Sequence, residues 1–285
     1  MKRYPFGEYI LDIPDDHKIG DVHAVDHLYD RAFSMFYRKI AQRRPNGVVV
    51  DIGANIGDTA AVILGACSEN PVICLEGSRE FLPYLRSNLR QLGPRVTIVD
   101  RYLRPSIAEP IPLRAVHDSG TGYLSEGGGH DATLDPSAFI EIDDLLHLAS
   151  GLGPDVALVK TDTDGFDGYI VAELLERVDC PLFFECDPQL GLQNVASPWP
   201  GVFRDLAARG YSVIVFDNHG LPMLAAESGV DQLLTDLCGY LALQRAIHPV
   251  RLHYLDVWAF PPAWAPTYVS LRDTLRGDLL KPYRF

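Results

Sequence analysis

The stretch from Val48 to Leu64 constrains the fold of this chain more than any other part of its 285 residues. Three valines lead into Asp51, the loop Gly53-Ala-Asn-Ile-Gly57 follows, and an apolar run completes the stretch. The valines predict a buried strand, and the apolar run predicts a buried helix segment. Glycines between the two allow a sharp turn and let a ligand approach the backbone where a Cβ would collide. The stretch therefore predicts the strand–loop–helix unit of a mononucleotide site.

The start of the predicted helix offers hydrogen-bond donors to such a ligand. The first N–H groups of a helix have no partner within the helix, and here they belong to residues near Gly57, Asp58 and Thr59. Asn55 stands where the dinucleotide-binding fingerprint has a glycine, so the loop departs from that fingerprint. An ordinary βα turn, in which Asp51 is satisfied within the protein, is the alternative interpretation.

Strand and helix patterns alternate along the rest of the chain. Short apolar or β-branched runs predict further strands at 71–76, 95–100, 155–160, 181–185, 211–216 and 252–260. Apolar residues at helical spacing predict helices at 26–44, 79–92, 166–178, 199–209 and 230–246. This alternation predicts a doubly wound, Rossmann-like α/β sheet of seven strands with an N-terminal helical cover. The helix at 26–44 either covers a ligand or simply packs on the sheet.

The chain shows no internal repeat, linker or low-complexity tract, which predicts a single domain. We expect an arm and a helix in residues 1–46, a core in 47–260 and a C-terminal tail in 261–285. The segment 101–135 contains a predicted hairpin, 113–116 with 121–124, and a glycine-rich stretch at 126–130. That stretch is either a flap over a site or an exposed loop. His117 and His130 lie in this segment and are candidate bases, although isolated loop histidines seldom have a chemical role.

Carboxylates stand at the carboxyl ends of four predicted strands, at Asp51, Glu76, Asp162 and Glu185. The ligand crevice of an open α/β sheet lies outside these ends. Like charges repel and shift one another's pKa, so a purely structural chain has little reason to gather them there. Glu76 lies 23 residues beyond Gly53, near the interval at which such folds place a carboxylate for ribose hydroxyls.

Several motifs in this order resemble the FkbM-type family of S-adenosylmethionine (SAM)-dependent methyltransferases. Asp51 to Gly57 reads Asp-x-Gly-x-Asn-x-Gly, and Phe139-Ile-Glu-Ile-Asp-Asp144 resembles a second family element. Lys160-Thr-Asp-Thr-Asp-Gly-Phe-Asp167 resembles the signature Lys-x-Asp-x-Glu-Gly-x-Glu, with aspartates at 164 and 167 in place of glutamates. Phe184-Glu185 resembles the family's strand-end glutamate, and together the motifs cover about residues 48–187.

The resemblance implies a class I methyltransferase fold, SAM as the cofactor, and methyl transfer to a hydroxyl of a small molecule, such as a natural product or sugar. SAM has no pyrophosphate to press against the helix, so a third glycine in the loop is less necessary. The ammonium of its methionine part would bind Asp51, directly or through water. The cofactor residues implied are Asp51, Gly53, Asn55, Gly57, Asp58, Thr59, Glu76 and Ser78.

Methylation of an alcohol requires an oriented hydroxyl whose proton is removed as the new bond forms. Asp162 is the first candidate for the base or orienting group, and Asp164 is the second. Lys160 either keeps a carboxylate ionised or forms an ion pair beneath the sheet. Because aspartate is one methylene shorter than glutamate, the positions of the carboxylates at 164 and 167 differ from the family pattern.

A divalent metal is an alternative means of activating the hydroxyl. Asp162 with Glu185 or Asp187 would offer two or three oxygen ligands to Mg²⁺, which lowers the pKa of a bound alcohol. Carboxylates at strand ends also cap helices and pair with lysines, so these residues have a structural interpretation as well.

The charge and cysteine content of the chain limit its partners and location. Lys and Arg number 25 and Asp and Glu 38, a net charge of −13, which opposes binding to nucleic acid or anionic membranes through general electrostatics. The sequence shows no run near the about 20 apolar residues of a membrane span and no signal-peptide core after Met1. The cysteines lack metal-ligand spacing, which predicts reduced thiols and a cytoplasmic location. They are Cys67, Cys74, Cys180, Cys186 and Cys238.

The sequence leaves three functions to distinguish. The first is a SAM-dependent O-methyltransferase acting on a small molecule, for which a homodimer is a compatible assembly. The second is a catalytically inactive SAM-binding subunit, which the aspartates at 164 and 167 favour. The third, a nicotinamide-dependent oxidoreductase, would use the same strand–loop–helix unit and an acid after the next strand, but Asn55 and the segment 160–167 oppose it.

Overall fold

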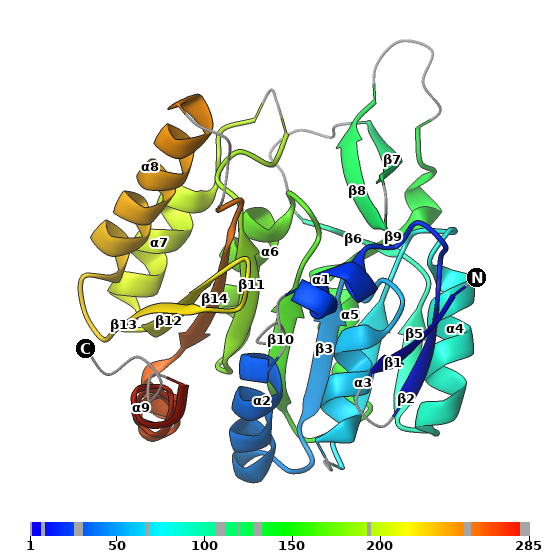
Figure 1. The fold of residues 1–285 in the computed structure, drawn as a ribbon, viewed down its shortest axis with the longest axis horizontal. Helices are drawn as coiled ribbons and strands as arrows, with labels where there is room; N and C mark the ends of the chain where they lie inside the picture. The colour runs from blue at the N-terminus through cyan, green and yellow to red at the C-terminus, as the bar shows by residue number, and fades with distance from the viewer. Residues whose placement is uncertain are drawn as a thin grey trace.

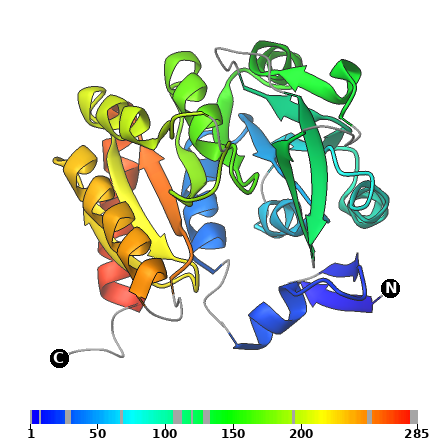
Figure 2. The same cartoon turned by 90° about the horizontal axis from the view of Figure 1, so that it is seen from above.

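The computed structural model describes residues 2–6, 9–25, 31–66, 69–105, 112–118, 120–127, 133–192, 195–247 and 252–279. Within these ranges the main sheet has eight strands, with helices on both faces (Figure 1, Figure 2). In spatial order they are β13 (Pro222–Ala226), β12 (Ser212–Asp217), β14 (Leu255–Phe260), β11 (Leu182–Cys186), β10 (Val156–Thr161), β3 (Val48–Ile52), β4 (Val72–Leu75) and β5 (Val96–Val99). The predicted doubly wound, Rossmann-like α/β fold is therefore confirmed.

The strands from β5 to β11 run parallel, whereas β14 is antiparallel to both β11 and β12. All seven predicted strands lie in this sheet, and β13 adds an edge strand beside β12. The sequence did not predict β13 because it begins at Pro222, which reads as a strand breaker; proline is tolerated at the first residue of an edge strand.

Two hydrophobic clusters lie on the two faces of the sheet, because successive side chains of a strand point to opposite faces. Val48, Val50 and Ile52 of β3 belong to one cluster, and Val49 belongs to the other. The first cluster includes side chains of α5 (Ile142–Ser150), α6 (Asp167–Arg177), α7 (Trp199–Ala208) and α8 (Val230–Ile247). The second includes α2 (Arg31–Arg43), α3 (Asp58–Gly65), α4 (Leu82–Leu89) and α9 (Ala265–Thr274).

The helix predicted at 26–44 is described from Arg31 onward, as α2, and it packs on the sheet. Phe36 is fully buried, and its ring centroid lies 4.9 Å from that of Trp258 on β14 and 5.7 Å from that of Phe216 on β12. Residues 26–30 lie outside the described ranges. Within the predicted tail, α9 packs on the same face through Tyr268 and Leu271.

Smaller elements surround the sheet. The N-terminal arm forms the hairpin β1 (Lys2–Phe6) and β2 (Tyr9–Ile13), followed by the short helix α1 (Ile19–Val25), which the sequence did not predict. The hairpin predicted in the segment 101–135 is confirmed as β7 (Leu113–Asp118) and β8 (Thr121–Glu126). The remaining elements are β6 (Tyr102–Arg104), β9 (Phe139–Glu141), η1 (Arg90–Leu92), η2 (Pro136–Ala138), η3 (Pro262–Trp264) and η4 (Leu275–Leu279). None of the helices in the described ranges has both the length and the apolar composition to cross a bilayer.

Asn88 of α4 connects the N-terminal hairpin to the loop after β3. This fully buried side chain accepts the Asp12 N–H (2.7 Å) and donates to the Asp12 carbonyl (3.0 Å) and the Ile56 carbonyl (2.8 Å). The amide therefore ties β2 and the glycine loop to one point on α4.

We expect Asn88→Ala to lower the free energy of unfolding by at least about 2 kcal/mol, because a buried polar group left without a partner costs about 1–3 kcal/mol. Gln91→Ala is the matched control, since Gln91 donates to the Ile10 carbonyl (2.8 Å) from an exposed position. That change should stay within about 0.5 kcal/mol. Urea denaturation followed by circular dichroism measures both, and equal effects of the two variants would contradict the role of Asn88.

Candidate active site

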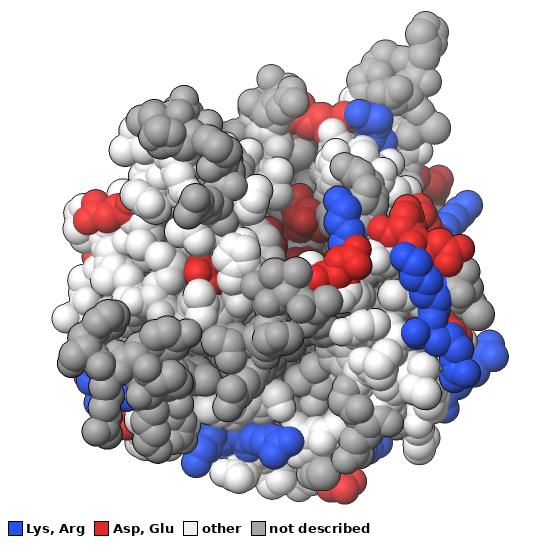
Figure 3. All heavy atoms as spheres, in the orientation of Figure 1, with Lys and Arg blue, Asp and Glu red and all other residues white. Residues whose placement is uncertain are grey.

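A cleft of about 440 Å³ lies at the carboxyl ends of the central strands. The loop after β3 supplies Gly53 and Asn55 to its wall, and the first turn of α3 supplies Asp58 and Thr59. Acidic side chains from the loop after β10 and from β11 line the same cleft; they are Asp162, Asp164 and Glu185. Red acidic atoms lie at the bottom of a hollow on this face in Figure 3. The cleft is thus where parallel α/β sheets bind their ligands.

The loop after β3 has the backbone conformation that its glycines predict. Gly53 (φ 78°) and Gly57 (φ 90°) are left-handed, a conformation that glycine adopts without steric cost. A Cβ on Gly53 would collide with the backbone carbonyl of Asp162, so the loop after β10 approaches here too closely for any other residue. Asn55 is also left-handed (φ 47°), which asparagine tolerates better than most side chains.

Glu76 at the end of β4 holds this loop in place. Its Oε2 accepts the N–H of Asn55 (2.8 Å), and its Oε1 accepts the N–H of Ser78 (2.7 Å). A smaller cavity of about 40 Å³ beside Glu76 is also lined by Gly77, Tyr102 and Asp162. Burial raises the pKa of Glu76, and the two N–H donors partly oppose that rise.

The side chain of Asn55 joins the loop to two segments distant in sequence. Its Nδ2 donates to the carbonyl of Gly120, in the turn of the β7–β8 hairpin (3.0 Å), and its Oδ1 lies 3.4 Å from Nε2 of His17. His17 also lines the cleft, and burial lowers its pKa. The sequence gave no reason to select His17, because neither its spacing nor its neighbours form a motif.

The candidate bases His117 and His130, and Ser78, lie away from the cleft or outside the described ranges. His117 Nδ1 is 3.4 Å from the Ser78 hydroxyl and 3.6 Å from the Glu80 carboxylate, so it ties β7 to the start of α4. Ser78 is buried and does not line the cleft. His130 and most of the glycine-rich stretch lie outside the described ranges, so its role as a flap stays a prediction.

Lys160 forms a buried ion-pair network beneath the loop. Its Nζ lies 3.2 Å from Asp51 Oδ1, 3.3 Å from Asp162 Oδ2 and 3.4 Å from the Gly53 carbonyl. Burial alone would lower the pKa of Lys160, but the charges of Asp51 and Asp162 outweigh it and raise that pKa. Lys160 is therefore a charged ammonium group that holds three segments together.

The two aspartates paired with Lys160 differ in whether solvent or a ligand can reach them. Asp51 is fully buried, lines none of the cavities described here, and forms no hydrogen bond of good geometry with a described residue. Burial raises its pKa, and the charge of Lys160 opposes that rise. The Asp162 side chain is 41% exposed and lines the cleft, the cavity beside Glu76 and the aromatic pocket described below. Asp162 is thus the group of this network that a ligand can reach.

The aspartates at 164 and 167 have different environments. Asp167 is buried, and its carboxylate accepts the Thr161 hydroxyl (2.7 Å) and the Thr163 N–H (3.1 Å), which closes the loop after β10. Burial and the charge of Asp162 raise its pKa to about 6. Asp164 is left-handed (φ 51°) and lines the cleft. Burial and the carboxylates of Asp162 and Asp167 raise its pKa to about 8.

Glu185, at the end of β11, is 8% exposed and lines both the cleft and the aromatic pocket. Burial and the carboxylates of Asp162 and Asp164 raise its pKa well above the usual range. No three His, Cys, Asp or Glu side chains in the described ranges group as metal ligands, so a Mg²⁺ site with three such ligands is not supported, and a site with two carboxylates stays a prediction. Asp187 does not line the cleft; instead its Oδ1 accepts the Gln189 N–H (2.8 Å) in a turn.

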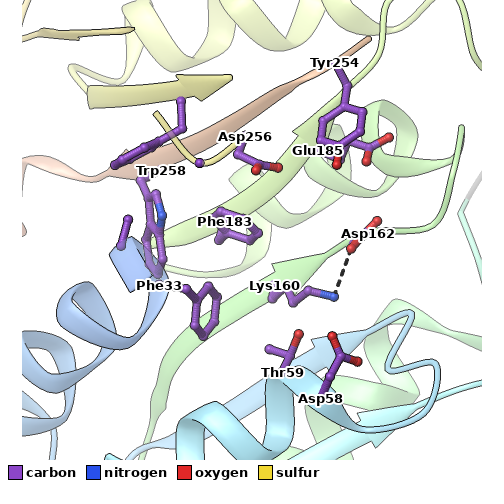
Figure 4. Close-up of a pocket in the computed structure, with 13 residues that line it drawn as sticks. Phe33, Asp58, Thr59, Lys160, Asp162, Phe183, Glu185, Tyr254, Asp256 and Trp258 are labelled. Carbon is purple, nitrogen blue, oxygen red and sulfur yellow. Dashed lines mark ion pairs between the residues drawn. The ribbon is translucent and has the colours of Figure 1, made fainter. Parts of the chain in front are cut away.

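A pocket of about 60 Å³ opens from the cleft between α2 and the sheet (Figure 4). Its walls combine carboxylates with aromatic side chains from α2, β11, β12, β14 and the residue before β14; the aromatic residues are Phe33, Phe183, Phe216, Tyr254 and Trp258. Phe33 comes from the helix whose packing the sequence left undecided, so α2 both packs on the sheet and lines the site.

Comparison with known proteins does not assign a family. No protein-family model matches the chain, the FkbM family included, and no curated protein matches its sequence. Among solved structures, an O-methyltransferase from Bacillus cereus in complex with S-adenosylhomocysteine is 12% identical, with a TM-score of 0.42 over 87% of this chain and 92% of the other. The precorrin-6y C5,15-methyltransferase from Geobacter metallireducens is 13% identical, with a TM-score of 0.37 over 78% and 84%. At these TM-scores neither similarity decides an activity.

We expect Asp164→Asn to stabilise the protein, and more at pH 8.5 than at pH 5. The pKa of Asp164 is raised on folding to about 8, so the unfolded chain loses its proton first and wild-type stability falls as pH rises from about 4 to about 8. Asparagine removes that loss and tolerates the left-handed backbone. Each kcal/mol gained would raise the Tm by about 2–4 °C.

The control is Asp205→Asn, which removes the same charge from an exposed position on α7. Thermal unfolding at the two pH values measures both variants. If Asp164→Asn raised the Tm equally at pH 5 and pH 8.5, or if Asp205→Asn raised it as much, ionisation of Asp164 in the folded protein would not be what lowers the stability.

Proposed function

We propose that this chain is a SAM-dependent methyltransferase that methylates a hydroxyl group of a small molecule. The observation that supports it best is the position of Asp162. This carboxylate lines the cavity beside Glu76, the cleft along the glycine loop and the aromatic pocket. It therefore lies between a nucleoside-type end and an apolar end of one continuous site, where a transferred group and its acceptor would meet.

The residues at the first end suit the adenosine and methionine parts of the cofactor. Each oxygen of Glu76 accepts one N–H, and a carboxylate oxygen can accept more than one hydrogen bond. Glu76 can therefore position the loop and accept from ribose hydroxyls at the same time. Gly53, Asn55, Asp58 and Thr59 line the adjoining cleft, so the loop backbone is accessible to a ligand.

The charge and topology of the site oppose a dinucleotide. A pyrophosphate would meet the carboxylates of Asp58, Asp162 and Asp164. Two lysines, Lys18 and Lys160, line the same cleft, and the charge of Lys160 is already shared between Asp51 and Asp162. The dinucleotide-binding sheet has the order 3-2-1-4-5-6, whereas here antiparallel β14 separates β11 from β12. A ligand with a sulfonium and an ammonium group fits this acidic cleft better.

The remaining chemistry belongs to residues of this chain. SAM, when bound, supplies a methyl group that is already activated for transfer. Asp162, held at the wall by Lys160 (3.3 Å), accepts the hydrogen bond of the acceptor hydroxyl and takes its proton. Asp51 supports Lys160 from below the loop, since it is buried and does not reach the cleft. Asp164 lines the cleft and is the second candidate for this role, which it can take only where the pH is high enough to ionise its carboxyl group.

Cofactor choice is the first test. Calorimetry should show binding of S-adenosylhomocysteine and none of NADH. Glu76→Ala should weaken S-adenosylhomocysteine binding by about 1.5–3 kcal/mol, the range for hydrogen bonds to a charged group. Glu141→Gln, an exposed change outside the cleft, should leave the affinity unaltered. Tight binding of NADH without S-adenosylhomocysteine would instead support an oxidoreductase.

Asp162→Asn separates an enzyme from an inactive SAM-binding subunit. Asparagine preserves size while removing charge and basicity, so we expect near-normal S-adenosylhomocysteine affinity and transfer reduced about 10²–10⁴-fold, the usual contribution of general acid–base help. Single-turnover transfer and cofactor titration on the same preparation measure both. Undiminished transfer would show that Asp162 is not the base, and a large loss of cofactor affinity would place Asp162 in the cofactor site.

A further inference from the structure

The carboxyl edge of the sheet orders the site residues from one end to the other. Glu76 follows β4, the glycine loop follows β3, Asp162 follows β10, and Glu185 is the residue before the last of β11. Neighbouring strands lie about 4.8 Å apart, so β11 is about 10 Å from β3, two strands away. Glu185 therefore lies beyond Asp162, on the side opposite the residues proposed to hold the cofactor.

The pocket around Glu185 has an aromatic floor. The ring centroids of Phe33, Phe183 and Trp258 lie 4.9–5.2 Å from one another. Phe183 and Trp258 are opposite each other across β11 and β14. These rings come from a helix and two strands that pack tightly, so the floor is preformed. An apolar ring on a ligand would gain contact area against it.

The mouth of this pocket is acidic. Glu185 is opposite Asp256 two register positions further along the same strand pair, and both line the pocket with Asp162 (Figure 4). Lys160 is the cation at this wall, and its charge is shared between Asp51 and Asp162. Ionisation of both carboxyl groups on directly opposed strand positions is costly, so a positive charge at the mouth would favour the ionised form of Glu185.

Glu185 itself lacks a partner among the residues that the structure describes. It is 8% exposed, lines both the cleft and the pocket, and forms no hydrogen bond or ion pair with any of them. Buried polar groups in folded proteins are nearly always hydrogen-bonded, so an exception calls for a ligand or another specific explanation. Tyr254 and Asp256 do have interactions within the chain, which leaves Glu185 as the group of this wall that is available to a ligand.

We propose that this pocket binds the methyl acceptor, and that the acceptor is a hydroxyl compound with an apolar ring and a protonated amine that pairs with Glu185. The inference rests on the proposed function, because it assigns the substrate class of the same site. The ring contacts Phe33, Phe183 and Trp258, the hydroxyl reaches Asp162, and the ammonium group replaces the missing partner of Glu185. Compounds that carry a carboxylate or phosphate at that place are rejected by the surrounding acids.

The test uses the full chain saturated with S-adenosylhomocysteine and three probes of one shape. Tyramine carries a phenol and an ammonium group, 4-ethylphenol has no charge, and 3-(4-hydroxyphenyl)propanoate carries a negative charge instead. A second series of three compounds has the same side chains on a cyclohexanol ring in place of the phenol. In at least one series we expect the amine to bind about tenfold or more tightly than the neutral compound, since a hydrogen bond to a charged group is worth that much. The carboxylate should bind most weakly.

Glu185→Gln should abolish the preference for the amine and leave S-adenosylhomocysteine affinity unchanged. Glu176→Gln makes the same chemical change at an exposed position on α6 and should retain the preference. The ranking of the probes by the wild-type protein is informative even if Glu185→Gln does not fold.

The two proposals fail in different ways. Absence of S-adenosylhomocysteine binding by the wild-type protein would overturn the proposed function. Binding of S-adenosylhomocysteine with no preference for either amine, or a preference that survives Glu185→Gln, would overturn the acceptor class alone. Equal or tighter binding of the neutral compounds would overturn it in the same way, because it would mean that Glu185 is protonated and donates a hydrogen bond to an uncharged acceptor.

Discussion

The buried ion pair between Lys160 and Asp51 is the interaction on which the site depends. An isolated charge in the interior is costly, and a buried pair is favourable only when its geometry and neighbours compensate for lost hydration. Here Lys160 also lies near the Gly53 carbonyl and Asp162, so one ammonium group holds β3, β10 and both of the loops that follow them. Removal of either partner would leave the other charged and buried. The position of Asp162 at the junction of three cavities follows from this constraint.

Some polar groups of the site form hydrogen bonds that hold its loops in place, and others face the cleft and remain available to a ligand. Glu76 and Asn55 use hydrogen bonds to hold the glycine loop against β4 and the β7–β8 hairpin, and Asp167 closes the loop after β10. Asp164 and Glu185 instead face the cleft in a crowded acidic environment that raises their pKa values. Such groups lower the stability of the protein without a ligand. Proteins retain costs of this kind mainly where function requires them.

The part of the fold that the sequence predicted is the part governed by local pattern. Runs such as Val48–Val50 and Val213–Val215 belong to strands that are covered on both faces of the sheet, which leaves a clear signal in the sequence. The elements it did not predict carry weak patterns: β13 begins at a proline, α1 has seven residues, and α9 buries few side chains. The structure, not the sequence, also revealed that α2 contributes Phe33 to the site and that the N-terminal arm contributes His17.

The sequence by itself determined which chemistry-bearing residues end the strands, because alternation of strands and helices brings those ends to one edge of the sheet. Asp51, Glu76, Asp162 and Glu185 were all recognised on that basis. Only the tertiary structure decided what each can do, since access and partners depend on segments far apart in the chain. Asp51 is buried under Lys160, Glu76 holds the loop, Asp162 reaches the cleft and Glu185 is left without a partner in the described ranges. Spacing along the chain specifies an edge of the sheet, whereas burial and pairing are properties of the packed molecule.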